Sequence, residues 1–138
     1  MQNNEHKVQI FQADELELIA CAFKMRLMQI RTAIKDVDIL LSKSKFEPKK
    51  PILDKYRLGL LADLEKNGNE LCDVIKVNCV DIAGAPKPLT FFIKLWADIK
   101  RYLAEHCQGT KASLYRKEAE DLYKCAENLL KWQTEQRV

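Results

Sequence analysis

The sequence predicts an all-α protein, folded as an antiparallel bundle of four helices. Four stretches repeat apolar residues at helical spacing, short segments with Pro or Gly separate them, and no strand pattern or internal repeat is present. The composition agrees, because 47% hydrophobic and 31% charged residues with only four Gly and four Pro are typical of a soluble helical protein. A length of 138 residues predicts one domain, residues 13–138, after a tail or helix remnant at residues 1–12.

The first helix is predicted to run from Ala13 to about Ser44. Carboxylates occupy its first turns, where the helix dipole favours them. Its apolar seam repeats at steps of four and three, through Phe23, Leu27, Ile30, Ile34, Val37 and Leu41. The segment FEPKKP at residues 46–51 ends it, because each Pro disfavours the α conformation in the residue before it.

Three more helices follow. The second is predicted from about Ile52 to Val80, with a core side of Leu53, Tyr56, Leu60, Leu64, Leu71 and Ile75. Gly68 stands where a core residue is due, which suggests that a neighbouring helix approaches closely there. A loop at residues 81–88 precedes the third helix, residues 91–107, which buries Phe92, Leu95, Ile99, Leu103 and His106. After a tight turn at 107–110, the fourth helix covers residues 111–134 and is expected to bury Leu114, Leu122, Cys125, Leu129 and Trp132.

Charged residues form a stripe along one side of the third helix. Their signs alternate through Lys94, Asp98, Arg101 and Glu105, and Tyr102 lies at the border of this stripe. The first helix carries its own cation pair two turns apart, Lys24 and Arg31. Cations at this spacing beside a phenol suit a phosphate. The alternative is a solvated ladder of ion pairs, each worth about 0.2–0.5 kcal/mol.

Composition excludes several classes of function. The net charge is only +3 and the cations are interleaved with acids, which argues against nucleic-acid binding. No apolar run approaches the length needed to cross a bilayer, so we expect no membrane partner. The five cysteines include no CxxC pair or zinc spacing, so we expect buried thiols, no metal, no cofactor and a cytoplasmic or nucleocytoplasmic location. No nucleophile lies beside a base and no Gly-rich phosphate loop is present, so we expect no enzyme.

Three stretches resemble the 14-3-3 protein family. KLWADIKRYLAEHCQG at residues 94–109 is similar to the segment that holds the family's Arg-Tyr phosphate ligands. YRLGLLADLEKNGNELCDVI at residues 56–75 resembles the family's fourth helix, and ELIACAFKMRLMQIR at residues 17–31 resembles its third. The resemblance implies a truncated or divergent member that corresponds to the third to sixth helices, a partial right-handed helical array.

The resemblance also implies a function and its residues. It implies an adaptor in signalling that binds phosphoserine or phosphothreonine segments of client proteins. The ligands would be Lys24, Arg31, Arg101 and Tyr102, with Lys94 nearby on the same helix.

The chain departs from the family in ways that bear on this function. The helices that would pair with Tyr56 and Asp63 in a homo- or heterodimer have no counterpart here, which leaves dimerisation open. The helices that supply the groove's asparagines and apolar wall are also lacking, so weaker binding is expected. Ala33 replaces the phosphorylatable serine of several relatives.

Two other hypotheses remain. One is a helical scaffold or oligomerisation domain without phosphopeptide binding, and the other is a partial gene product with little function. In an adaptor the cation pairs should converge on one point, whereas in a scaffold they should be neutralised separately.

Overall fold

The computed structural model describes residues 12–81 and 83–136, and within them it contains four long α-helices and no strand. These are α2 (Ala13–Leu41), α3 (Lys50–Ile75), α4 (Pro86–His106) and α5 (Gly109–Gln136). The all-α prediction is confirmed. The tail or helix remnant expected at residues 1–12 lies, up to residue 11, outside the described residues.

Both proline-containing segments are more helical than expected. A 3₁₀ helix, Ser44–Lys49, replaces most of the loop predicted at 46–51, and α3 begins directly after it with Pro51 in its first turn. In the same way, α4 begins at Pro86, five residues before the predicted start. Proline is tolerated in the first turn of a helix, because the backbone N–H that it lacks would have no partner there.

The end of α3 continues into a short π-helical turn, Lys76–Val80. The backbone N–H of Asp81 donates to the carbonyl of Lys76 at 2.9 Å and closes this turn. Helical structure therefore extends to Val80, where the sequence placed the end of the second helix. Gly84 follows in the loop with a φ of 76°, a backbone conformation that favours glycine.

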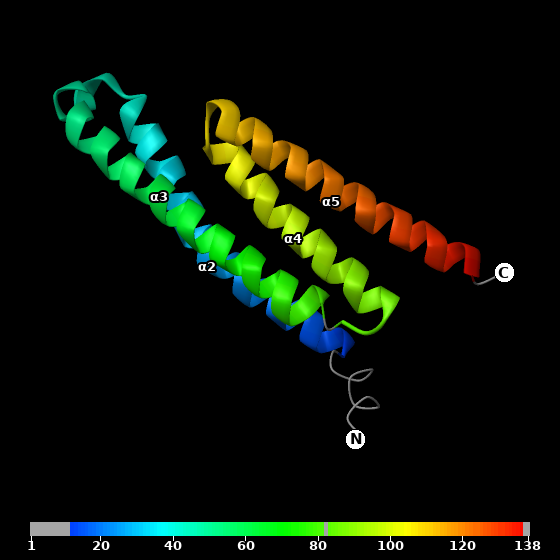
Figure 1. Cartoon of the computed structure of the whole chain (residues 1–138). Helices are drawn as coiled ribbons and strands as arrows, with labels where there is room; N and C mark the ends of the chain where they lie inside the picture. The colour runs from blue at the N-terminus through cyan, green and yellow to red at the C-terminus, as the bar shows by residue number, and fades with distance from the viewer. Residues whose placement is uncertain (1–11, 82, 137–138) are drawn as a thin grey trace.

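The helices form two antiparallel hairpins, α2 with α3 and α4 with α5, and α4 lies between α3 and α5 (Figure 1). Consequently α2 and α4 run in the same direction. The core lies where α2, α3 and α4 meet. Its largest fully buried side chains are Leu27, Ile34, Leu64, Ile75, Phe92, Ile99 and Leu103.

At Gly68, α3 lies close against α4. A Cβ atom at this position would lie 2.9 Å from Cδ2 of Leu103, closer than real Cβ contacts allow. Leu103 is itself fully buried and belongs to the segment of α4 that carries the predicted site. The close approach expected from the sequence is therefore confirmed, and it couples the packing of α3 to the position of this segment.

The buried side of α5 differs from the prediction. Leu114 and Trp132 are 56% and 50% exposed, and Cys125 is also exposed. The side chains that α5 buries are instead Ala112, Tyr115, Ala119 and Ala126. Small alanine side chains let α5 lie close to α4, and this contact fixes which side of the helix faces inward.

One smaller expectation was wrong and another holds only in part. Tyr56, assigned to the core side of the second helix, is 57% exposed. Of the five cysteines, Cys72 and Cys79 are buried, but Cys21 and Cys125 are exposed.

Within the described part of the chain, no helix combines the length and apolar character needed to span a membrane. The same residues include no cluster of three or more His, Cys, Asp or Glu side chains that could hold a metal ion.

Candidate functional site

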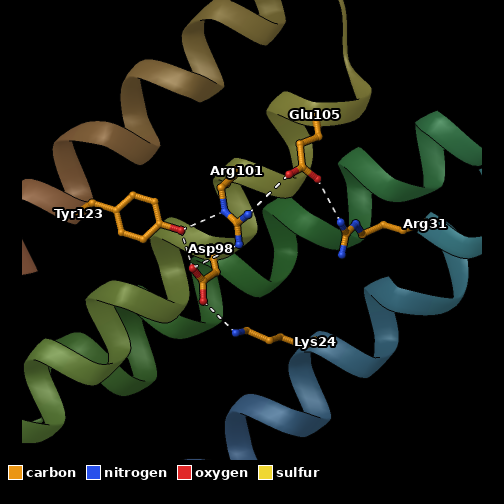
Figure 2. A network of polar contacts seen from close by, with 6 residues as sticks. All are labelled: Lys24, Arg31, Asp98, Arg101, Glu105 and Tyr123. Carbon is orange, nitrogen blue, oxygen red and sulfur yellow. Dashed lines mark hydrogen bonds and ion pairs between the residues drawn. The ribbon is translucent and has the colours of Figure 1, made fainter.

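Two cations on α2 reach across to two carboxylates on α4. Lys24 Nζ lies 2.8 Å from Asp98 Oδ2, and Arg31 Nη2 lies 3.0 Å from Glu105 Oε1. Both pairs join residues 74 positions apart, because α2 and α4 run in the same direction and each carries its charges seven residues apart. Figure 2 shows the four side chains meeting between the two helices.

Arg101 lies between the two carboxylates and connects the network to α5. Its guanidinium is 3.9 Å from Asp98 and 3.6 Å from Glu105. Its Nε–H donates to the hydroxyl of Tyr123 on α5 at 3.2 Å, and this hydroxyl donates to Asp98 Oδ1 at 2.5 Å (Figure 2). Arg101 therefore binds side chains of its own helix and of α5, while its carboxylate neighbours hold the cations of α2.

Tyr102 supports the cluster with its ring. The residue is only 9% exposed, and the guanidinium of Arg31 lies over the ring, 3.9 Å from its centre. Arg101 lies 5.3 Å from the same centre. A cation over an aromatic face is held by the ring quadrupole, so Tyr102 fixes the orientation of Arg31. Its hydroxyl makes no hydrogen bond to another described residue, so the donor role toward a phosphate stays a prediction.

Lys94 is the one predicted ligand that the structure leaves outside the network. It is exposed and makes no ion pair with another described residue. It borders a pocket beside Tyr123, which also borders the neighbouring pocket at Arg101. The other residues of the Lys94 pocket are Thr90, Ala126, Glu127 and Leu130.

Contacts within the network raise the pKa of Lys24 and of Tyr123. Burial alone would lower the pKa of Lys24, but the hydrogen bond and the charge of Asp98 raise it overall. Burial and the hydrogen bond to Asp98 raise the pKa of Tyr123 to about 12, so its hydroxyl stays a donor to this carboxylate. Three cations therefore face two carboxylates, and the cluster of Lys24, Arg31, Arg101, Asp98 and Glu105 carries a net charge of +1.

The sequence did not indicate that His106 lies near the cations of the site. It lies on the apolar stripe of α4, as predicted, but it is only half-buried, and its Nε2 is buried without a hydrogen-bond partner among the described residues. Burial lowers the pKa of His106, as do the positive charges of Arg31, Lys35 and Arg57, while Glu105 opposes them. The imidazole is therefore a neutral group packed beside the cations of the site.

Tyr123 was also not among the predicted ligands. On its own helix it stands between two buried alanines, Ala119 and Ala126, at steps of four and three. That spacing could have placed it on the side of α5 that faces α4.

Comparison with curated proteins gave no match. A family model described as 14-3-3 protein matches residues 1–137 of the chain. The match covers both helices that supply the cations, and α5, which supplies Tyr123. Since it spans nearly all of the 138 residues, the chain belongs to the 14-3-3 family.

Proposed function

We propose that this protein binds segments of client proteins phosphorylated on serine or threonine, and that it acts in signalling as an adaptor without catalysis. The observation that carries the proposal is the convergence of Lys24, Arg31 and Arg101, from two helices, on one pair of carboxylates. Membership of the 14-3-3 family supports an adaptor of this general kind.

The hydrogen-bonding capacity of Arg101 suits a phosphate. Among the described residues, only its Nε–H makes a hydrogen bond, to Tyr123, whereas its terminal nitrogens lie 3.6 and 3.9 Å from the carboxylates, beyond hydrogen-bond distance. The guanidinium is also half exposed. A phosphoserine brings a charge of about −1.5 to −2 and three strong acceptor oxygens, which these N–H groups can satisfy.

Lys24 and Arg31 would complete the site from the side of α2. Both are already oriented by carboxylates, so little side-chain entropy remains to be lost when a phosphate binds. The net charge of +1 on the cluster favours an anion, and Lys94 adds an exposed cation on the same helix as Arg101. Asp98 and Glu105 then position the cations.

A helical scaffold is the second candidate, and one observation favours it. Lys24 and Arg31 each have a carboxylate partner within 3.0 Å, so their ion pairs could serve only to join α2 to α4. Exposed apolar side chains on α3 and on the π-helical turn after it, among them Ile52, Tyr56 and Val77, would then contact a partner.

Fluorescence anisotropy of a labelled phosphoserine peptide and its unphosphorylated twin tests the proposal. We expect binding of the phosphopeptide alone. Arg101→Gln should weaken it by about 10- to 150-fold, because a hydrogen bond to a charged group contributes about 1.5–3 kcal/mol. Arg26→Gln is the matched control, since Arg26 lies on α2, is 55% exposed and pairs with Glu70 outside the network. Equal binding of both peptides, or equal losses in both variants, would favour the scaffold.

A further inference from the structure

Helix α2 carries a second apolar stripe, which the core does not use. Leu18, Cys21, Met25 and Met28 follow one another at steps of three, four and three, within an arc of roughly 80° on the helix. All four are exposed, and the exposed fractions of Leu18, Met25 and Met28 are 69%, 59% and 50%. We call these four residues the methionine stripe. Large apolar side chains in a row on one helix face differ from singly scattered ones, which need no explanation.

The methionine stripe borders the cation cluster. Met28 stands four residues after Lys24 and three before Arg31, so all three are neighbours on the surface of α2. Lys24 and Arg31 point from α2 toward α4, as Figure 2 shows. From Met28 the stripe continues toward the beginning of α2, where Leu18 and Cys21 line a hollow together with Asp14 and Glu17.

Resting on the proposed function, we infer that the methionine stripe selects phosphorylated segments that carry apolar side chains close to the phosphoresidue. The dimensions fit. Met28 lies within about 6 Å of Lys24 and Arg31 along the helix axis, at roughly 1.5 Å per residue. Leu18 lies about 14 Å from the midpoint of these two cations on the same scale. An extended peptide covers that length in about four residues, at roughly 3.3 Å each.

The charges around the methionine stripe favour such a narrow, extended occupant. Lys24 borders it on one side, and Asp14 and Glu17 lie at its far end. A second copy of the chain that covered this face with the roughly 800 Å² per partner of a standard interface would bury these charges as well. Methionine side chains are flexible and polarisable, so they can adapt to different apolar residues.

Two exposed cysteines provide a direct test. Cys21 belongs to the methionine stripe, whereas Cys125 lies on α5, and both are exposed. The alkylation rate of each thiol by iodoacetamide is measured by peptide mass spectrometry with three saturating peptides. These are a phosphoserine peptide with leucines within four residues of the phosphate, the same phosphopeptide with alanines, and the unphosphorylated leucine peptide. We expect only the leucine phosphopeptide to slow alkylation of Cys21 several-fold, with Cys125 unchanged.

Affinities of the same peptides complete the test. The leucine phosphopeptide should bind about five- to tenfold more tightly than the alanine phosphopeptide, as partial burial of apolar side chains predicts. Met28→Gln should remove most of this preference. Leu114→Gln, which changes a similarly exposed apolar residue on α5, should leave it intact.

The possible failures are distinguishable. Equal binding of the two phosphopeptides, with Cys21 alkylated at its free rate, would overturn the inference and leave the phosphate site standing. Loss of binding for both phosphopeptides by folded protein would overturn both proposals. Protection of Cys21 by the unphosphorylated leucine peptide, or by raised protein concentration alone, would show that the stripe serves another partner.

Discussion

Two glycines in the interior of α3 predict opposite effects of the same substitution. Gly59 has no heavy atom within 4 Å of the place where a Cβ would stand. Gly59→Ala should therefore stabilise the protein by about 1 kcal/mol, the difference in helix propensity between the two residues. Gly68→Ala gains the same propensity, but its Cβ would lie 2.9 Å from Leu103 Cδ2 and 3.3 Å from Cδ1 and Cγ. Leu103 is fully buried and cannot move away without displacing the core.

Overpacking of this kind costs about 1–3 kcal/mol. The free energy of unfolding of the Gly68→Ala variant should therefore be about 1–3 kcal/mol lower than that of the Gly59→Ala variant. Urea denaturation followed by circular dichroism measures the difference, and each 1 kcal/mol should move the Tm by about 3–5 °C in a domain of this size. In a Leu103→Ala background the clash is absent, so Gly68→Ala should become stabilising there. Equal stabilisation by both alanines in the wild-type background would refute the close contact.

Three further predictions concern the site and its surroundings. Tyr123→Phe removes the acceptor for Arg101, and phosphopeptide affinity measured by anisotropy should fall up to about tenfold with no change in helicity. The pKa of His106 is lower in the folded than in the unfolded protein, so the unfolded protein takes up a proton first as the pH falls. The free energy of unfolding should therefore decrease as the pH drops from 7 through the ordinary pKa of histidine. His106→Gln should remove this part of the pH dependence, as urea denaturation at several pH values would show. Burial raises the pKa of Cys72 to about 12, so iodoacetamide should alkylate the exposed Cys21 far faster, and equal rates would contradict the buried position.

The fold was predictable from the sequence where large side chains fix the helix face. The seam of α2 contains Leu27, Ile34 and Val37, all buried as the spacing predicted. On α5, the predicted Leu122 and Leu129 are half-buried, but Leu114 and Trp132 are exposed. The prediction overlooked the alanines, whose small side chains carry a weak hydrophobic signal although they allow close helix contact. The repeat of Ala112, Tyr115, Ala119 and Ala126 at steps of three, four and seven was present in the sequence all the same.

The residues of the candidate site were predictable from the sequence, and the contacts between them were less so. Cation spacing on two helices and the resemblance to 14-3-3 proteins selected Lys24, Arg31 and Arg101, and the structure brings these three together. The pairing across 74 residues depends on how α2 lies against α4, which no local pattern encodes. For the same reason the spacing on one helix could not show that Lys94 stays outside the network while Tyr123, from another helix, enters it.

The ion pairs of the network contribute little to the stability of the fold. The side chains of Lys24 and Asp98 are 35% and 21% exposed, and those of Arg31 and Glu105 are 13% and 43% exposed, so solvent screens both pairs and each contributes at most about 1 kcal/mol. A domain of this size typically has a stability of about 5–15 kcal/mol, supplied mainly by apolar burial. A brace between α2 and α4 could be built more effectively from apolar side chains, which would also avoid gathering three cations at one place. A small contribution to stability is what the proposed phosphate site requires of these ion pairs, since their role there is to hold the cations in position.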